Sequence, residues 1–221
     1  MKKKIGVIGL GYVGLPLAIN FGKKKNFIVY GFDEDGSKLN LILKGKSYIR
    51  HIKSLDVKNF IKKNKVTTDY SLIKNLDLII LCLPTPLKPN LKPDLSYIKL
   101  CLKKIKPFLR KGQTLSLESS TYPGTTEEII VKTLKKKFKV GKNFNVIYSP
   151  EREDPGNKIK MELIPKVLSG YSEKCAKNGK FYYSKVFKKV LIAKDLKTAE
   201  FSKILENVFR SINIGLVNEI K

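Results

Sequence analysis

Three glycines near the start of the chain, Gly9, Gly11 and Gly14, form a G-x-G-x-x-G string in which Tyr12 and Val13 separate the last two. The string follows a segment typical of a strand and opens a segment typical of a helix. There the first glycine makes a tight turn, the second lets the backbone approach a pyrophosphate, and the third lets the helix pack on the strand. Free N–H groups at the helix N-terminus then face the phosphates. The string therefore predicts a dinucleotide site made by these five residues.

An acidic residue follows at a spacing that suits the same ligand. Asp33 ends the second expected strand, 24 residues after Gly9. A carboxylate there accepts hydrogen bonds from the adenosine ribose hydroxyls and repels a 2′-phosphate, which favours NAD over NADP. Alternatively, Asp33 belongs with Glu34 and Asp35 to an acidic cluster that caps the next helix. Because strand, glycines and acid agree, we expect NAD as the cofactor.

Three further segments with hydroxyl or acidic side chains each follow an expected strand. They are residues 84–86 (PTP), 119–121 (SST) and 149–151 (SPE). Each suits an ordinary loop, since Ser, Thr and Pro favour turns. However, the carboxyl ends of parallel strands meet at one edge of a sheet, where open α/β sheets bind ligands. We therefore expect these segments to share one site with the glycine loop.

Short apolar runs alternate with helical segments along the whole chain. Strands are expected at residues 4–9, 27–32, 66–67, 76–83, 114–118, 144–148, 167–170 and 190–193. Helices are expected at residues 12–24, 34–43, 95–105 and 125–136, between the last two strands, and at 198–220. This alternation predicts an α/β fold with a Rossmann-type, doubly wound parallel sheet and helices on both faces.

Composition and charge narrow the possible partners. The 221 residues include 45 basic and 19 acidic side chains, which gives a formal net charge of +26. Only four of the basic residues are arginine, the side chain that reads bases and phosphates in a bidentate manner. The lysines are spread along the chain without a basic tail. We therefore expect lysines on solvated faces, a field that favours anionic substrates, and no nucleic-acid partner.

The cysteine and histidine content argues against disulfides and metals. Cys82, Cys101 and Cys175 are scattered and form no C-x-x-C pair, and His51 is the single histidine. This pattern fits a reducing cytosol and predicts neither a disulfide framework nor a metal site. No apolar run approaches the roughly 20 residues of a membrane helix. We expect a cytoplasmic protein with no membrane partner.

Several longer segments carry a family resemblance. They are GVIGLGYVGLPLA from Gly6, SYIRHI from Ser47, LPTPL from Leu83, LESSTYPGTTEE from Leu117, SPEREDPGN from Ser149 and ENVFRSINIGLVNEI from Glu206. In these segments the chain resembles the N-terminal half of the UDP-glucose/GDP-mannose dehydrogenase family. Within that family it resembles the UDP-N-acetylhexosamine 6-dehydrogenases of surface-polysaccharide synthesis. TYPGTT and SPEREDPGN together are specific to that branch, and they disfavour a 6-phosphogluconate-type Rossmann dehydrogenase.

The resemblance implies a reaction and an architecture. Such enzymes oxidise the C6 alcohol of a UDP-N-acetylhexosamine to a carboxylate and pass two hydrides in succession to NAD. A cysteine holds the intermediate, which splits one difficult oxidation into easier steps. In the architecture, residues 1–194 form the NAD-binding Rossmann domain. Residues 195–221 form a long helix that begins a central dimerisation domain, which makes the full-length protein a homodimer.

The resemblance also implies cofactor-binding residues. Residues 11–13 match the family's pyrophosphate turn. Asp33 matches its ribose-binding acid, and Lys38 matches a basic residue beside the ribose. Thr85 and Thr121 match loop hydroxyls near the cofactor and the reacting centre.

Two of the matched residues imply acid–base chemistry. Glu151 matches an acid near the substrate, and in UDP-glucose dehydrogenases a second glutamate follows four positions later. Here that position is Pro155, so the general-base role does not transfer directly. Thr121 with a bound water then becomes a second catalytic candidate.

The last helix supplies polar candidates on one face. Lys203 and Asn207 are expected to stabilise an oxyanion at C6, and Arg210 and Asn213 to contact sugar or phosphate oxygens. The alternative is a merely solvated face opposite an apolar stripe. That stripe consists of Phe201, Ile204, Leu205, Val208 and Ile212.

One element of the family is missing from this sequence. The nucleophilic cysteine of such enzymes lies in a G-G-H-C segment, and this chain has none. We expect the chain to bind NAD without completing the oxidation, as an incomplete part of a dehydrogenase. The alternative is a stand-alone NAD-binding module, or half of a split enzyme, without catalysis.

Overall fold

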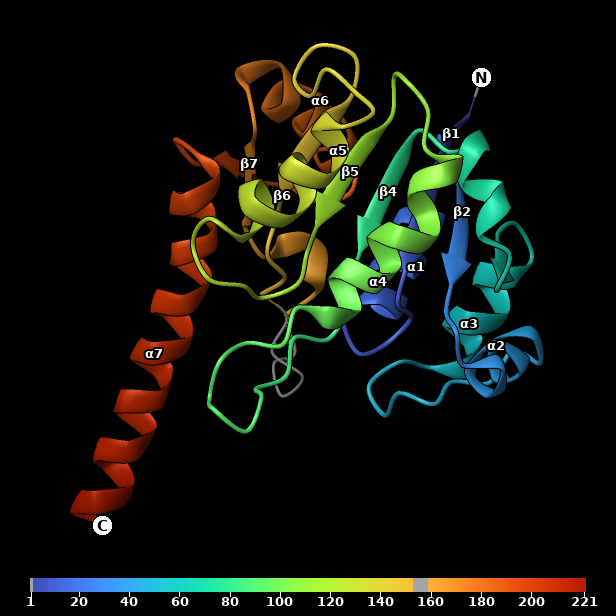
Figure 1. Ribbon diagram of the computed structural model, residues 1–221. Helices are drawn as coiled ribbons and strands as arrows, with labels where there is room; N and C mark the ends of the chain where they lie inside the picture. Colours follow the sequence, from blue (N-terminus) through green and yellow to red (C-terminus); the bar gives the residue numbers. More distant parts are fainter. Residues whose placement is uncertain (1, 153–158) are drawn as a thin grey trace.

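The computed structural model describes residues 2–152 and 159–221. In these residues eight strands form one sheet in the order β3-β2-β1-β4-β5-β6-β7-β8 (Figure 1). The strands are β1 (Lys3–Ile8), β2 (Phe27–Phe32), β3 (Lys65–Thr67), β4 (Leu78–Leu81), β5 (Thr114–Leu117), β6 (Asn145–Tyr148), β7 (Lys166–Gly170) and β8 (Val190–Ile192). The order reverses between β1 and β4, which is the switch point where doubly wound sheets bind ligands.

The predicted α/β class and doubly wound sheet are confirmed, with one local difference. Strands β1 to β6 pair in parallel, whereas β7 runs antiparallel to β6, and β8 is parallel to β7. In the described part of the β6–β7 connection we find only the short turn η4 (Met161–Leu163). The described part of this connection contains no crossover helix, and β7 runs opposite to β6, as antiparallel neighbours allow.

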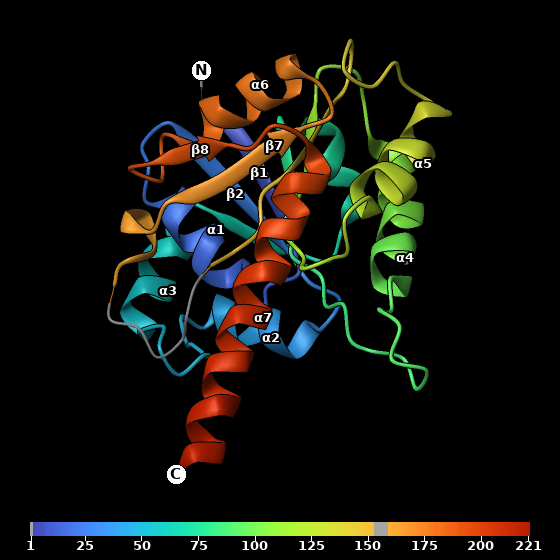
Figure 2. The same cartoon turned by 90° about the vertical axis from the view of Figure 1, so that its left-hand side faces the viewer.

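Helices cover both faces of the sheet. Figure 2 shows α1 (Gly14–Gly22) and α3 (Ser54–Ile61) on one side and α4 (Ser96–Ile105) and α5 (Lys132–Lys135) on the other. The remaining helical segments are α2 (Gly36–Leu43), η1 (Tyr70–Asn75), η2 (Lys106–Phe108), the π-helical η3 (Thr126–Val131) and α6 (Glu173–Tyr183). Helix α3 and η1 were not predicted, and the helix predicted at 125–136 divides into η3 and α5.

The core consists of two apolar clusters separated by the sheet. In β4, Leu78 and Ile80 join the cluster beneath α1 and α6, whereas Ile79 and Leu81 join the cluster beneath α4. All four are fully buried. A strand with both faces covered is apolar at every position, which explains why this run was recognisable in the sequence.

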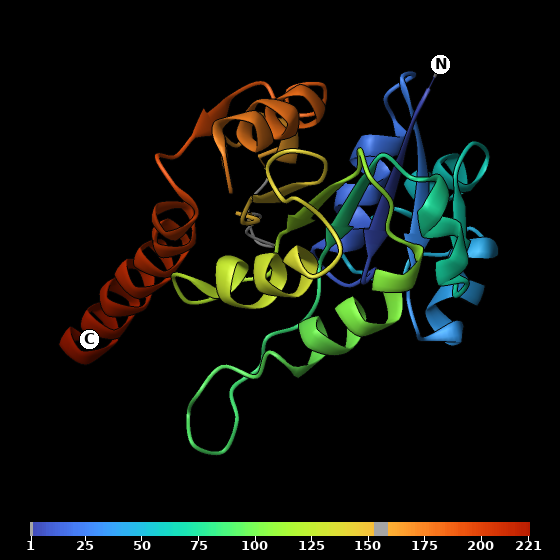
Figure 3. The same ribbon diagram turned by 45° about the horizontal axis from the view of Figure 1, so that its top comes forward.

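The final helix, α7 (Leu196–Ile220), packs on the domain only at its start. Asp195 caps it by accepting a hydrogen bond from the Thr198 N–H at 2.7 Å. Beyond the first turn it runs away from the sheet (Figures 1 and 3), and Phe201, Leu205 and Ile212 of the predicted apolar stripe are more than half exposed. No helix in the described part of the chain is long and apolar enough to span a membrane.

Candidate active site

A cavity of about 780 Å³ opens at the carboxyl ends of β1, β2, β4 and β5. Its lining brings together the glycine loop, the end of β2, and the loops after β4, β5 and β6. The predicted site residues that line it are Gly9, Gly11, Tyr12, Val13, Asp33, Lys38, Thr85, Glu151 and Lys203. These segments, together with residues of α4 and α7, lie far apart in the sequence and meet at one edge of the sheet.

The three glycines of the loop have different surroundings. Gly9 has φ +88°, and a side chain there would collide with the Cys82 carbonyl. Gly14 packs so closely that a side chain would collide with the Gly9 carbonyl. In contrast, a Cβ at Gly11 would meet nothing within 4 Å, so the space in front of this residue is open. Gly11 is thus the point where a ligand can approach the backbone closely.

The start of α1 offers donors to an anion. No side chain among the described residues caps this end of the helix. The Leu15 and Leu17 N–H groups donate to the Gly11 and Val13 carbonyls at 3.1 and 3.3 Å, and Pro16 has no N–H. Among the described residues, the N–H groups of residues 11–14 therefore remain as donors near the positive end of the helix dipole. Together with the open face of Gly11, this arrangement fits the diphosphate of a dinucleotide.

Asp33 lines the cavity at the end of β2, beside the glycine loop. Its Oδ2 accepts the Leu10 N–H at 2.8 Å and its Oδ1 the Asp35 N–H at 3.0 Å, while Lys38 Nζ lies 3.6 Å away. Helix α2 is capped by Asp35, which accepts from the Ser37 N–H at 2.9 Å. The capping alternative therefore applies to Asp35, and Asp33 instead braces the glycine loop beside the cavity. We call Gly9, residues 11–13, Asp33 and Lys38 the cofactor side.

The loops after β4 and β5 are joined above the sheet. Ser119 Oγ donates to the Leu83 carbonyl at 2.7 Å and accepts the Leu83 N–H at 3.0 Å. Thr85 Oγ1 donates to the Ser120 carbonyl at 2.7 Å. Thr121 lies outside the cavity lining: it is buried beside Tyr148, and its hydroxyl makes no hydrogen bond of standard geometry with a described residue.

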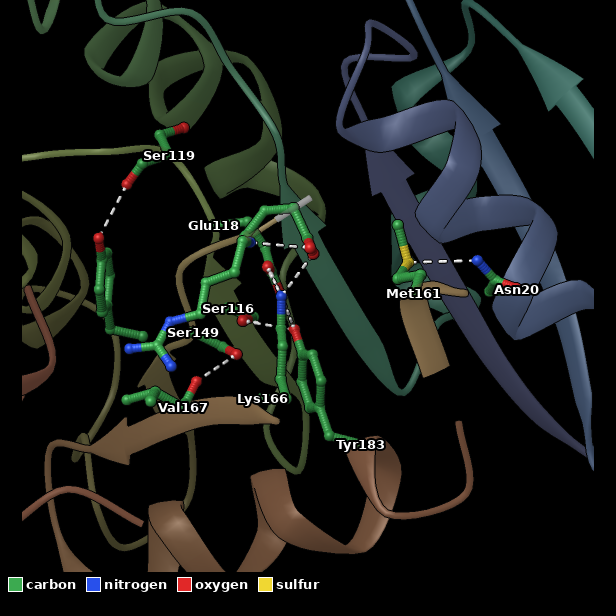
Figure 4. Close-up of polar contacts among 12 residues, drawn as sticks. Asn20, Ser116, Glu118, Ser119, Ser149, Met161, Lys166, Val167 and Tyr183 are labelled. Atoms are coloured by element: carbon green, nitrogen blue, oxygen red, sulfur yellow. Dashed lines mark hydrogen bonds and ion pairs between the residues drawn. The ribbon is translucent and has the colours of Figure 1, made fainter. Parts of the chain in front are cut away.

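The opposite wall of the cavity contains a buried charge cluster. Lys166 Nζ lies 2.6 Å from Glu118 Oε2 and 2.7 Å from Glu151 Oε2. The Tyr183 hydroxyl donates to Glu118 Oε1. Figure 4 shows Lys166 from β7 and Tyr183 from α6 pointing toward Glu118 at the end of β5. We call Glu118, Glu151, Lys166 and Lys203 the charged wall.

Burial sets the protonation of this cluster. The pKa of Glu118 is raised to about 7, mainly because burial disfavours its charged form; Lys166 opposes the shift and Glu151 reinforces it. Burial alone would lower the pKa of Lys166, but the two carboxylates outweigh it and raise that pKa. The ammonium is therefore charged at neutral pH, whereas Glu118 exchanges its proton there.

Strand β5 positions the cluster through its polar face. Thr114 Oγ1 donates to Asn178 Oδ1 at 2.9 Å, and Ser116 Oγ lies 2.9 Å from the Tyr183 hydroxyl, both on α6. Glu118 follows with the same two-residue period of a strand. The sequence analysis missed Glu118 and Lys166 as site residues. The available signal was a lysine directly before the apolar strand predicted at 167–170.

Two contacts fix the start of α7 against this wall. The buried carboxylate of Glu200 accepts the N–H groups of Gly124 and Thr126 at 2.5 and 2.8 Å. Arg152 Nη2 pairs with Glu206 at 2.6 Å. Lys203 lies between these anchors and lines the cavity; burial lowers its pKa.

The other predicted residues of α7 lie outside the cavity. Asn207, Arg210 and Asn213 are exposed and absent from its lining. The Asn213 amide donates to the Phe209 carbonyl of its own helix at 2.7 Å. Pro155 and most of the SPEREDPGN segment lie outside the described residues.

The cysteines lack features of an activated nucleophile. All three are free thiols, and Cys82 and Cys101 line the cavity. Burial raises the pKa of the Cys101 thiol to about 12. Burial raises the pKa of the Cys82 thiol well above its usual range, which keeps it neutral. In the described part of the chain, no cluster of His, Cys, Asp and Glu has the arrangement of a metal site.

The switch point, the glycine loop and the acid at the end of β2 define a Rossmann-type dinucleotide-binding domain. The model of the UDP-glucose/GDP-mannose dehydrogenase family, NAD binding domain, matches residues 3–190. The chain therefore belongs to this family and contains its NAD-binding domain, which confirms the predicted family and cofactor.

Known relatives agree with this assignment. The chain is 34% identical over 98% of its length to a UDP-N-acetyl-D-glucosamine 6-dehydrogenase from Pseudomonas aeruginosa, and equally to a UDP-N-acetyl-D-mannosamine dehydrogenase from Pyrococcus horikoshii. A solved UDP-D-ManNAc dehydrogenase from Pyrococcus horikoshii superposes with a TM-score of 0.90 at 32% identity, over 98% of this chain and 52% of that one. The chain spans about half the length of the curated relatives it matches, 52% for both named here.

Proposed function

We propose that this chain is the NAD-binding half of an NAD-dependent UDP-N-acetylhexosamine 6-dehydrogenase of surface-polysaccharide biosynthesis. The observation that supports this function is a single cavity lined by a dinucleotide turn and by the side chains of Glu118, Glu151 and Lys203. NAD, when bound, accepts the hydride that leaves C6 of the sugar. The names of the relatives include two hexosamine epimers at equal identity, so the proposal extends to the class and not to one epimer.

We assign the residues of the cofactor side to NAD binding. The N–H groups of residues 11–14 at the start of α1 bind the diphosphate, which the open face of Gly11 supports. Asp33 accepts from the ribose hydroxyls, with Lys38 beside it. Thr85 and Thr121 extend the site toward the nicotinamide end.

We assign the substrate side to Glu151, Lys203 and the exposed residues of α7. Glu151 lies at the cavity wall and orients the sugar or its attacking water. The Lys203 ammonium stabilises the oxyanion that develops at C6, with Asn207 as a second donor. Arg210 and Asn213 contact the sugar or the phosphates once substrate and the remaining part of the enzyme cover α7.

The same substrate side supports a dimer in the complete enzyme. Apolar side chains of α7 are exposed along its length, including Phe209 at 69% and Ile220 at 74%. Faces of this kind are usually covered by a partner. We propose a cytoplasmic homodimer, and the three free thiols support the reducing compartment.

The raised pKa of Cys82 favours a second candidate for the chain on its own. Without an activated thiol, it binds NAD and does not complete the oxidation. This module would bind NAD and form no NADH with any UDP-hexosamine.

Calorimetry with NAD and NADP tests the cofactor assignment. We expect NAD to bind at least tenfold more tightly than NADP, and Asp33→Ala to weaken NAD binding by about tenfold or more, since a hydrogen bond to a charged group contributes about 1.5–3 kcal/mol. Equal binding of both cofactors would contradict the role of Asp33. NADH formation with UDP-N-acetylglucosamine, UDP-N-acetylmannosamine or UDP-glucose, assayed in the complete dehydrogenase, then tests the substrate class.

A further inference from the structure

Lys166 is the first residue of β7, and only 2% of its side chain is exposed. Lysines are rarely buried unless they are paired, because loss of hydration disfavours the charge. Besides Glu118 and Glu151, its Nζ lies 5.8 and 5.2 Å from the ring centroids of Tyr183 and Phe187. The ammonium is thus enclosed by two anions and two aromatic rings.

The cluster is asymmetric with respect to the cavity. Glu118 and Glu151 contribute to the cavity lining, whereas Lys166 lies behind them and does not. Any effect of Lys166 on a ligand must therefore pass through one of the carboxylates. The second carboxylate oxygen of Glu118 accepts a hydrogen bond from Tyr183, so Glu118 is fixed at the end of β5. Glu151 is the carboxylate that faces the substrate in the proposed function.

Other titratable groups face Glu151 from neighbouring elements. The backbone N–H of Arg152 donates to Glu151 Oε1 at 2.9 Å. Lys203 on α7 interacts electrostatically with Glu151, and the partly buried Cys82 thiol after β4 is neutral. Lys166 contacts the second carboxylate oxygen directly, at 2.7 Å.

We propose that Lys166 is a positioning residue that holds the Glu151 carboxylate ionised and fixed at the cavity wall, with Glu118 as a second anion that shares the Lys166 charge. The inference rests on the proposed function, in which Glu151 faces the sugar. When Glu118 takes up a proton, the whole charge of Lys166 acts on Glu151. Lys166 therefore acts on the charge of Glu151 from behind the cavity lining, and Glu118 acts on it through Lys166.

The test is a carboxyl-carbon NMR titration of the full 221-residue chain, labelled at glutamate, with the Glu151 signal assigned by its loss in Glu151→Gln. Lys166→Met removes the cation, so the midpoint of the Glu151 titration should rise by about one to three pH units. Lys166→Arg keeps the charge and should restore the midpoint. Glu118→Gln mimics the protonated Glu118 that is already present at the lower pH where Glu151 titrates, so it should leave the midpoint unchanged.

Lys177→Met is the matched control, because Lys177 pairs with Glu173 at 2.5 Å on the surface. It should leave the Glu151 midpoint unchanged. An unchanged midpoint in Lys166→Met, or a Lys166→Arg midpoint as high as that of Lys166→Met, would overturn the inference. If Lys166→Met does not fold, as judged by circular dichroism, the neutral variant Lys166→Gln is titrated in its place, with the same expected rise.

NAD calorimetry on the same samples separates this inference from the proposed function. A wild-type chain that binds NAD, with a Glu151 midpoint that no variant moves, overturns only the positioning role. A chain that shows the expected midpoints but does not bind NAD supports the electrostatic link and overturns the proposed function.

Discussion

The cofactor side and the charged wall form one cavity by different means. On the cofactor side the groups available to a ligand are mostly backbone N–H groups of a single turn. Asp33, which braces this turn, accepts a hydrogen bond from Leu10, 23 positions earlier in the sequence. On the charged wall the groups are side chains from separate elements, and Lys166 reaches Glu118 across 48 positions. Such a turn needs only one strand and the helix that follows it. The charged wall, in contrast, forms only when β5, β6, β7 and α7 have all assembled.

The largest expected effect is on the charged wall. Lys166→Met leaves two carboxylates buried together without their cation, which typically costs about 3–5 kcal/mol. We expect the free energy of unfolding, measured by urea denaturation at pH 7, to fall by that amount. Lys177→Met, which breaks an exposed pair, should change it by less than about 0.5 kcal/mol. Similar losses of unfolding free energy in both variants would mean that the buried pairs of Lys166 contribute no more to stability than an exposed surface pair.

The second effect is on pH dependence. The folded pKa of Glu118 is about 7 against 4.5 for an unperturbed glutamate, so the folded state binds the extra proton between these values. The free energy of unfolding should therefore fall as pH rises through this interval, by an amount on the order of 3 kcal/mol. Denaturation of wild type and Glu118→Gln at several pH values should show this fall only in wild type. Parallel curves would contradict the raised pKa.

The third effect distinguishes two glycines of the G-x-G-x-x-G loop by their effects on stability and on NAD affinity. Gly14→Ala collides with backbone and should lower the free energy of unfolding by about 1–3 kcal/mol. Gly11→Ala meets open space, so stability should change by less than about 0.5 kcal/mol while NAD affinity falls about tenfold or more. Calorimetry and denaturation of both variants measure this. An unaltered NAD affinity in Gly11→Ala would contradict the proposal that this turn binds the diphosphate.

The smallest effect concerns the anchor of α7. The Arg152–Glu206 pair is partly exposed, with 42% of the Glu206 side chain accessible. Glu206→Gln should therefore lower the free energy of unfolding by less than about 1 kcal/mol and leave NAD affinity unchanged. A loss of NAD binding in this variant would mean that the anchor of α7 affects the cofactor side more strongly than its contacts indicate.

The same contrast explains what could be predicted from the sequence. Strand β2 was predicted at its observed bounds, and Asp33 was recognised beside the glycine loop, because apolar runs and turn residues act locally. Lys166 and Glu118 could not be recognised, since a lysine becomes a buried partner only through a contact 48 positions away. Helix α3 was missed because only Val57 and Phe60 of its residues are buried, so its apolar periodicity is weak.

The antiparallel pairing of β7 with β6 orders the assembly of the domain during folding. Strands β1 and β2 pair through the single helix α1 that connects them, and this short crossover can form early. Lys166 cannot lose its hydration until both glutamates are in place, because an unpaired buried ammonium is strongly disfavoured. We therefore expect β7, with Lys166, to dock after β5 and β6, and its amides to exchange with solvent more readily than those of β1.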